Sequence, residues 1–135
     1  MQNPEHLLPD DPDQPVVLIA EDEPMIQNIA RITLEREGYF VLTAGNGEVA
    51  LRLSQQYPGK IHLLLADIVM PKMSGVELSN RILTERPGIR IVLMSGHTFA
   101  EKIDPTFPFL QKPFDLKDLK DTVRLSISAF HGTGP

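Results

Sequence analysis

Three consecutive residues of this sequence carry carboxylates, which repel one another at such short separation. Glu21, Asp22 and Glu23 directly follow residues 16–20, an apolar and mostly β-branched run that is predicted to form a buried strand. Three adjacent acids at a strand end oppose stability, and a divalent cation such as Mg²⁺, which prefers oxygen ligands, would relieve their repulsion. Capping of a helix that begins at Pro24 explains the same acids without a metal. From these residues alone, both explanations stand.

The composition narrows the class of protein. A chain of 135 residues suits one domain with one core. Its net charge of −5 disfavours non-specific binding to nucleic acid. It has no cysteine, which excludes disulfides, thiol nucleophiles and thiolate metal sites. No signal-peptide pattern and no apolar run of membrane-spanning length is visible, so we expect a cytoplasmic protein that does not contact the membrane.

The two ends differ in composition from the middle of the chain. Residues 1–15 combine four prolines with four acidic residues and have little apolar surface to bury, so we predict a flexible N-terminal arm. Residues 131–135 are predicted to be a flexible C-terminal tail. One folded domain is therefore expected over residues 16–130.

Strand and helix patterns alternate within this domain. Short apolar runs predict strands over residues 16–20, 39–43, 61–66, 89–94 and 107–111. Helical patterns follow from Pro24, Asn46, Gly75 and Asp115. The first helix is predicted to end at Gly38 as its C-terminal cap, and its apolar stripe consists of Met25, Ile26, Ile29, Ile32, Thr33 and Leu34. The alternation predicts an α/β fold with helices on both faces of a parallel sheet.

Reactive side chains follow the ends of the predicted strands. Asp67 follows the third strand, Ser95 the fourth and Lys112 the fifth, while the three acids follow the first. Ligands of open parallel sheets bind at the carboxyl ends of the strands. We therefore expect these side chains to converge on one edge, where carboxylates, a hydroxyl and an ammonium group can hold a metal and a phosphoryl group.

Four stretches of the sequence resemble the receiver domain of two-component response regulators, the family that includes the chemotaxis regulator CheY. They are VLIAEDEP at residues 17–24, LLADIVMPKMSG at 64–75, VLMSG at 92–96 and FLQKPF at 109–114. The resemblance covers about residues 16–130. It implies a flavodoxin-like, doubly wound (βα)5 sandwich whose five-stranded parallel sheet has the order 2-1-3-4-5.

The resemblance implies a role for each acid. Asp67 matches the phosphoacceptor, which attacks the phosphorus of a phosphohistidine and becomes an aspartyl phosphate. Asp22 matches a direct Mg²⁺ ligand, with Asp67 and the backbone carbonyl of Val69 as the other protein ligands. Glu21 stands where many receivers have Asp and is expected to bind the ion through water. Glu23 is expected to face solvent near the helix start.

The resemblance also implies how the phosphoryl group is held and reported. Lys112 and Ser95 match the residues that bind its oxygens, and the bond before Pro113 is usually cis in the family. Phe109 matches the aromatic residue that turns inward when the group arrives, although a core position in both states explains it too.

Two features depart from the family pattern. Residues 97–107 are fewer than the usual fourth helix and its loops need, so we predict a short or degenerate helix with at most one turn over residues 99–103. Val69 and His97 occupy rim positions that tune loss of the phosphoryl group in the family. Plain loop surface explains His97 equally simply.

The predicted function is that of a phosphoacceptor receiver in a two-component phosphorelay. Its partners would be a sensor histidine kinase or phosphotransfer protein and an unknown downstream protein, without direct DNA binding, and the chain is expected to be a monomer or weak dimer. It is predicted not to be an enzyme apart from self-catalysed phosphotransfer and autodephosphorylation. The alternatives are a receiver excised from a hybrid histidine kinase and a non-phosphorylated, flavodoxin-like adaptor.

Overall fold

The computed structural model describes residues 8–96 and 107–132. The elements are β1 (Val16–Ala20), α1 (Pro24–Arg36), β2 (Phe40–Ala44), α2 (Gly47–Gln56), β3 (Leu63–Asp67), α3 (Gly75–Glu85), β4 (Arg90–Ser95), β5 (Phe109–Gln111) and α4 (Leu116–Gly132). The helix expected between β4 and β5 falls outside the described residues. No helix in the described part of the chain has both the length and the apolar character needed to cross a bilayer.

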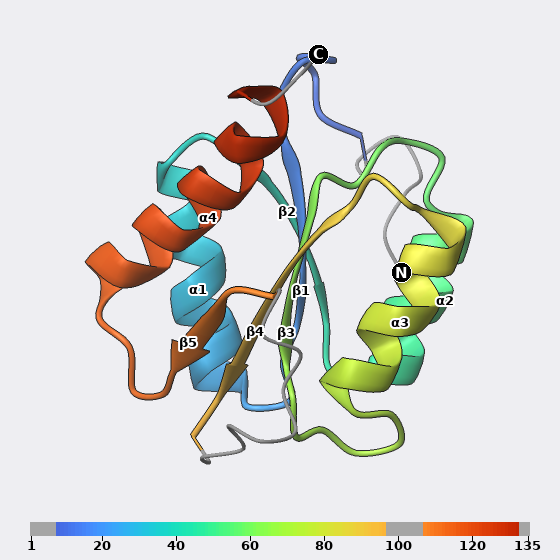
Figure 1. The fold of residues 1–135 in the computed structure, drawn as a ribbon, viewed down its shortest axis with the longest axis vertical. Helices are drawn as coiled ribbons and strands as arrows, with labels where there is room; N and C mark the ends of the chain where they lie inside the picture. The colour runs from blue at the N-terminus through green and yellow to red at the C-terminus, as the bar shows by residue number, and fades with distance from the viewer. Residues whose placement is uncertain (1–7, 97–106, 133–135) are drawn as a thin grey trace.

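The five strands form one parallel sheet with the order β2-β1-β3-β4-β5. Helices α1 and α4 cover one face, and α2 and α3 cover the other (Figure 1). This arrangement confirms the predicted fold and strand order. It also places β1 and β3 in the middle of the sheet, where their carboxyl ends come close together.

Burial on both faces explains the continuous apolar strands. In β1, Leu18 packs in the core shared with α2 and α3, whereas Val17 and Ile19 pack in the core shared with α1 and α4. All five residues of β1 are buried. Each large aliphatic side chain buried in this way stabilises the fold by about 1.5–3 kcal/mol. The core therefore anchors the strand that ends at the acidic cluster.

The buried face of α1 matches the predicted stripe only in part. Thr33 and Leu34 are buried as predicted, together with Ala30. Met25 is 74% exposed and Ile29 is 43% exposed, although both were expected in the apolar stripe. Helical spacing identifies residues that share a face, but the close approach to the sheet is made on the side that carries the small side chain of Ala30.

Several predicted boundaries are confirmed and others shift. Gly38 has φ +97° and follows the C-cap of α1, as expected for a left-handed glycine. The side chain of Asn46 accepts a hydrogen bond from Val49 N at 2.9 Å and caps α2. Strand β5 begins at Phe109 rather than at residue 107, because Pro108 has no N–H to donate to the ladder. Helix α4 runs through Gly132, two residues beyond the expected domain end.

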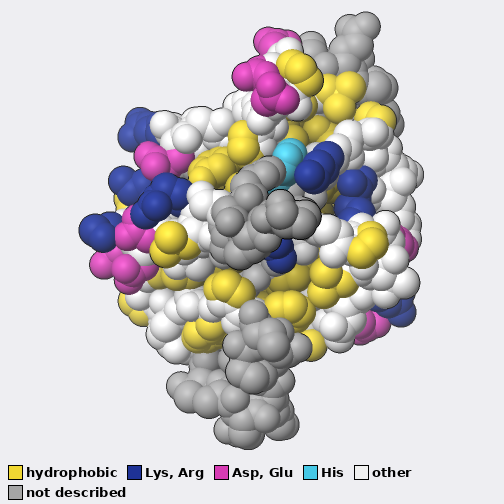
Figure 2. Space-filling model, turned by 45° about the horizontal axis from the view of Figure 1, so that its top comes forward, with side chains coloured by type: hydrophobic (Ala, Val, Ile, Leu, Met, Phe, Trp, Pro, Cys, Tyr) yellow, Lys and Arg dark blue, Asp and Glu magenta, His cyan; other side chains and the backbone are white. Residues whose placement is uncertain are grey.

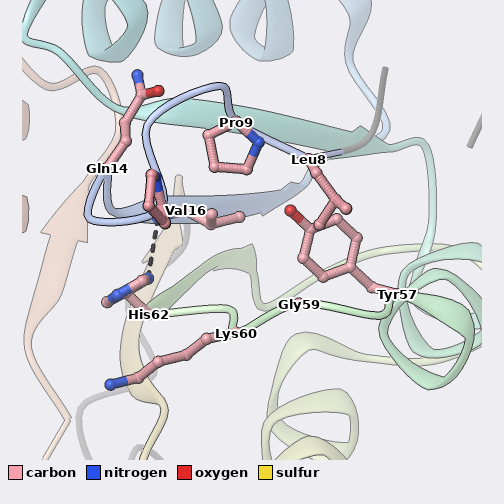
Figure 3. Close-up of a pocket in the computed structure, with 9 residues that line it drawn as sticks. Leu8, Pro9, Gln14, Val16, Tyr57, Gly59, Lys60 and His62 are labelled. Atoms are coloured by element: carbon pink, nitrogen blue, oxygen red, sulfur yellow. Dashed lines mark hydrogen bonds between the residues drawn. The ribbon is translucent and has the colours of Figure 1, made fainter. Parts of the chain in front are cut away.

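Residues 8–15 lie against the sheet edge opposite to the acids. Gln14 Nε2 donates to the Gly38 carbonyl at 2.9 Å, and Val16 N donates to Nδ1 of His62 at 3.0 Å. This segment and the loop that follows α2 together line a pocket of about 270 Å³, with Leu8 and Tyr57 among its lining residues (Figure 3). The described half of the predicted N-terminal arm thus contacts the domain, and its flexibility stays a prediction.

Charged side chains of both signs lie together on the side of α1 and α4 (Figure 2). Arg31 pairs with Glu35 on α1 at 2.9 Å, and Asp121 pairs with Lys117 and Arg124 on α4 at 2.8 and 3.1 Å. These are exposed pairs within single helices, so each contributes little to stability.

Two glycines allow close backbone contacts behind the strand that ends at Asp67. A Cβ atom on Gly75 would collide with the backbone oxygen of Asp67 and would lie 3.0 Å from Cα of Ile68. A Cβ atom on Gly47 would lie 2.6 Å from the backbone oxygen of Met73. The loop between β3 and α3 is therefore packed between the first residues of α2 and α3.

The close contact at Gly75 predicts a large effect for a single methyl group. We expect Gly75→Ala to lower the free energy of unfolding by about 1–3 kcal/mol, because backbone atoms must move to make room. Gly45→Ala is the control, since a Cβ atom at Gly45 meets nothing within 4 Å, and it should change stability by less than about 0.5 kcal/mol. Urea denaturation followed by circular dichroism measures both, and equal stabilities would contradict the packing described here.

Candidate functional site

The carboxyl ends of four strands meet at one edge of the sheet. Glu21 and Asp22 directly follow β1, Asp67 ends β3, Ser95 ends β4 and Lys112 directly follows β5. The predicted convergence of these residues is thus the arrangement found. The sheet brings together chain segments that are far apart in sequence, and the short parallel strands hold them at a common level.

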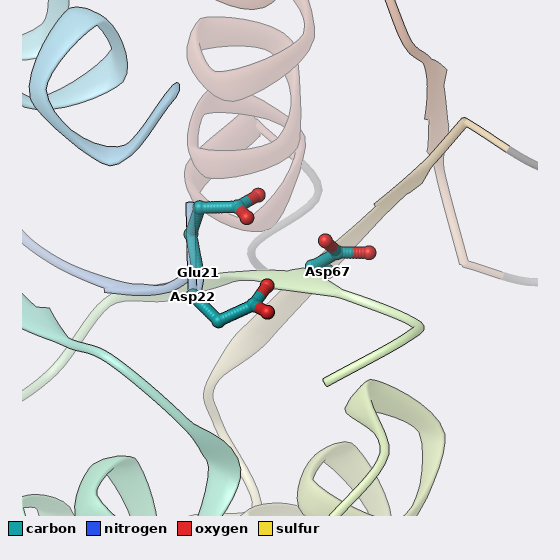
Figure 4. Close-up of side chains that lie close together, drawn as sticks. All are labelled: Glu21, Asp22 and Asp67. Carbon is teal, nitrogen blue, oxygen red and sulfur yellow. The ribbon is translucent and has the colours of Figure 1, made fainter. Parts of the chain in front are cut away.

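Three carboxylates at this edge form a compact cluster. One oxygen each of Glu21, Asp22 and Asp67 lies within 4.8 Å of the others, and the three side chains project into a common space (Figure 4). Glu21 and Asp67 are buried, whereas Asp22 is exposed. Oxygen ligands in this arrangement suit a hard divalent cation that keeps several water molecules.

Lys112 supplies a buried positive charge to the cluster. Its Nζ lies 2.7 Å from Glu21 Oε1, 2.8 Å from Asp67 Oδ2 and 3.4 Å from Glu23 Oε1, and its side chain is 9% exposed. Nζ donates hydrogen bonds to Asp67 Oδ2 and to Glu23 Oε1. The short contact between Glu21 Oε1 and Nζ is an ion pair. One ammonium group thus faces three carboxylates.

The environment shifts the pKa values of Glu21 and Lys112. Burial raises the pKa of Glu21 to about 7, against the opposing effects of Lys112 and of the Glu23 N–H. Burial by itself would lower the pKa of Lys112, but hydrogen bonds and charges from Asp67 and Glu21 outweigh it, and the pKa is raised. Lys112 is therefore a cation at neutral pH, while Glu21 is close to its midpoint.

Backbone N–H groups fix two of the three acids. Glu21 Oε2 accepts a hydrogen bond from Glu23 N at 2.9 Å, and Asp67 Oδ1 accepts one from Val69 N at 3.1 Å. Each bond spans two residues, as short polar turns do. Glu23 occupies the N-cap position of α1, but its side chain makes no capping hydrogen bond. The capping explanation is therefore wrong for Glu23.

The remaining predicted residues lie around this cluster. Ser95 is fully buried, and its carbonyl accepts a hydrogen bond from Lys112 N at 2.8 Å. Phe109 is half-buried against the core on the α2 and α3 side. The Val69 side chain is exposed at the rim, and the Lys112–Pro113 peptide is cis as expected. His97 lies outside the described residues.

Sequence reasoning missed Gln27. Its side-chain amide donates to the backbone carbonyls of Glu21 and Ala44, at the ends of β1 and β2. A signal was present in the sequence, because Gln27 precedes Ala30 by three residues and Leu34 by seven, and so shares their face of α1. The predicted apolar stripe contained Leu34 on this face, but it also contained Met25 and Ile29, which are exposed.

A family model describes the same region. The model of the response regulator receiver domain matches residues 17–124. The chain belongs to this family. The match covers the sheet apart from Val16 and includes all four strand ends that carry the site, so the predicted resemblance is confirmed.

Curated relatives of this receiver domain differ greatly in length. The sensor kinase CckA of Brucella abortus is 34% identical over 113 residues, which cover 80% of this chain and 12% of CckA. The response regulator receiver protein CpdR of the same species is 35% identical over 118 residues, which cover 84% of this chain and 97% of CpdR. The chain thus spans a small part of the first relative and nearly all of the second.

Solved structures of receiver domains share the fold. A CheY-like receiver domain protein from Methanospirillum hungatei has a TM-score of 0.81 and 25% identity, with coverage of 90% of this chain and 100% of that chain. The response regulator TrrA from Thermotoga maritima, solved in complex with Mg²⁺-BeF, has a TM-score of 0.72 and 29% identity. It is covered over 97% of its length by 82% of this chain.

The general function follows from this membership. The chain is a phosphoacceptor receiver domain of two-component signalling. Domains of this family interact with histidine kinases or phosphotransfer proteins and with downstream effectors. The matches to receiver domains do not favour a non-phosphorylated, flavodoxin-like adaptor. They do not favour a receiver excised from a hybrid kinase either, because they include both a short receiver protein and a long kinase.

The ion pairs of Lys112 predict a stability defect that depends on pH. In Lys112→Met, Glu21 and Asp67 face each other without a cation, so the pKa of Glu21 should rise further above about 7. A folded-state pKa above the unfolded value means that stability falls as pH rises between the two values. We therefore expect a loss of about 3–5 kcal/mol at about pH 8.5 and a smaller loss at about pH 5.5.

Urea denaturation at the two pH values measures this difference. Lys117→Met is the matched control, because Lys117 pairs with Asp121 on the exposed surface of α4. Its effect should be small and the same at both pH values. An equal defect of Lys112→Met at the two pH values would show that Glu21 does not take up the proton.

Proposed function

We propose that Asp67 accepts a phosphoryl group from a partner phosphohistidine in a reaction that depends on Mg²⁺. The observation that carries this assignment is the hydrogen bond from Lys112 Nζ to Asp67 Oδ2 beside the cluster of Glu21, Asp22 and Asp67. An oxygen of Asp67 forms the new bond to phosphorus while the bond from phosphorus to the imidazole nitrogen breaks. The electron pair of the broken bond leaves with the imidazole.

The donor set fits Mg²⁺. Three carboxylates and one ammonium group leave the cluster with an excess of negative charge, and carboxylate oxygens are hard ligands. When bound, Mg²⁺ would neutralise these carboxylates and the oxygens of the transferring group. Asp22 is proposed as a direct ligand together with Asp67 and the Val69 carbonyl, and Glu21 as a ligand through water. The related TrrA structure, solved in complex with Mg²⁺-BeF, supports Mg²⁺ as the cation.

The residues around Asp67 hold the phosphoryl group in this proposal. Lys112 pairs with one oxygen in place of Asp67 Oδ2, and the Ser95 hydroxyl donates to another. Phe109, already half-buried beside β4, turns further inward as the switch and reports phosphorylation without a hydroxyl group. Val69 and His97 are proposed to tune loss of the group from the rim.

The phosphoryl donor, the downstream partner, the compartment and the oligomeric state are proposed by analogy with the family. The phosphoryl donor is a sensor histidine kinase or a phosphotransfer protein in the cytoplasm, and the switched domain acts on a downstream protein as a monomer or weak dimer. We propose a domain over residues 16–130 with flexible arms over residues 1–15 and 131–135, of which residues 8–15 contact the domain and residues 131–132 continue α4. It is not a separate enzyme, since it catalyses only its own phosphorylation and dephosphorylation.

Chemical phosphorylation tests the acceptor. Acetyl phosphate with Mg²⁺ should add the mass of one phosphoryl group to the wild-type chain and none to Asp67→Asn, because an amide oxygen is a poor nucleophile. Asp10→Asn, an exposed position at the opposite sheet edge, is the control and should be modified like the wild type. Intact-mass spectrometry reads all three, and equal modification of Asp67→Asn would refute the assignment.

Metal titration tests the cluster. Asp22→Asn should weaken Mg²⁺ binding at least about tenfold, a change of about 1.4 kcal/mol or more, because it removes a charged ligand. The same variant should be slightly more stable than the wild type without Mg²⁺, since one of three repelling carboxylates is gone. Isothermal titration calorimetry and thermal unfolding measure the two effects. Unchanged affinity in Asp22→Asn would place the metal elsewhere.

A further inference from the structure

The side-chain amide of Gln27 lies between the carboxyl ends of two neighbouring strands. Its Nε2 donates to the Glu21 carbonyl at 3.0 Å and to the Ala44 carbonyl at 3.2 Å. A primary amide nitrogen carries two hydrogens, so these two carbonyls account for both. Gln27 therefore fastens the end of β1 to the end of β2 from its position on α1.

The carbonyl that Gln27 holds belongs to the peptide between the two neighbouring acids of the metal cluster. Rotation of the Glu21–Asp22 peptide would change the direction of the Asp22 side chain relative to that of Glu21. Two other hydrogen bonds hold Glu21 itself, from Glu21 N to the Ala44 carbonyl at 3.0 Å and from Glu23 N to Glu21 Oε2 at 2.9 Å. The bond from Gln27 is made to the carbonyl of the shared peptide itself.

Asp22 needs such restraint more than the other two acids do. Glu21 and Asp67 are buried and both contact Lys112, whereas Asp22 is exposed. An exposed side chain has few neighbours to limit its rotamers, so its position depends mainly on its own backbone. The backbone of Asp22 is joined directly to the peptide that Gln27 holds.

We propose that Gln27 is a positioning residue for the metal cluster. Its amide fixes the Glu21–Asp22 peptide so that both carboxylates face Asp67 (Figure 4). This inference rests on the proposed Mg²⁺ site. Gln27 touches neither the cation nor the phosphoryl group, and it acts through the backbone at the ends of β1 and β2. Groups that orient metal ligands in this way change metal affinity by about 10–100-fold when they are lost.

A matched pair of substitutions isolates this role. Gln27→Met keeps nearly the length of the side chain and removes both N–H donors. Gln55→Met makes the same chemical change on α2, where Gln55 Nε2 donates to Glu85 Oε2 at 3.0 Å on the exposed surface. We expect the Kd for Mg²⁺, measured by isothermal titration calorimetry, to rise about tenfold in Gln27→Met and less than about twofold in Gln55→Met.

The dependence of phosphorylation on Mg²⁺ separates positioning from simple destabilisation. Gln27→Met should need more Mg²⁺ for its half-maximal rate with acetyl phosphate, yet should approach the wild-type rate at saturating Mg²⁺. A substitution that only loosened the fold would lower the maximal rate and leave the half-saturating concentration unchanged. Gln27→Asn, whose amide is one methylene too short to reach both carbonyls, should shift the half-saturating concentration in the same direction.

The outcomes distinguish this inference from the metal site itself. Absence of Mg²⁺ binding in the wild type would overturn the proposed site. Binding in the wild type with an unchanged Kd in Gln27→Met and Gln27→Asn would overturn only the role of Gln27. Failure of both variants to fold would overturn it as well, because the amide would then be required for the fold rather than for the direction of Asp22.

Discussion

The cluster at the carboxyl ends of the strands depends on the ion pairs between the ammonium group of Lys112 and the carboxylates of Glu21 and Asp67. Glu21 and Asp67 are buried, and two buried carboxylates so close together are unfavourable without a nearby cation. Lys112 follows β5, the outermost strand on that side of the sheet, and its side chain reaches both carboxylates. The parallel strand order 2-1-3-4-5 makes this contact possible, because the carboxyl ends of β1, β3 and β5 all lie at the same end of the sheet.

The remainder of the fold holds these charged side chains in position. Strands β1 and β3 are buried on both faces, so their ends have little freedom to shift along the sheet. Short hydrogen bonds then orient individual groups, from Glu23 N to Glu21, from Val69 N to Asp67 and from the Gln27 amide to the backbone. The apolar core sets the separation of the strand ends, and the polar contacts set the direction of each side chain. Both levels are required for three acids to share one space.

Much of this arrangement could be predicted from the sequence, and the failures have physical causes. The apolar runs and their terminal acids predicted the sheet and the convergence of Asp22, Asp67, Ser95 and Lys112, since parallel strands all carry their carboxyl ends on one edge. The covered face of α1 could be predicted only in part. Thr33 and Leu34 are buried as expected, whereas Met25 and Ile29 are exposed although they are apolar too. The contact of Lys112 with Glu21 was missed for a different reason. It joins residues 91 positions apart, and its pairing depends on side-chain directions that no local pattern contains.

The packing of Gly75 and Gly47 leaves no free space behind Asp67 on the side of α2 and α3. Backbone atoms behind Asp67 touch the start of α3, and the Met73 carbonyl in the same loop touches the start of α2. A close-packed interior has no slack to absorb displacement in that direction. A displacement of the Asp67 backbone is therefore opposed on the side of α2 and α3, so a group added to its carboxylate has to be accommodated on the other side, where Lys112 makes its contact.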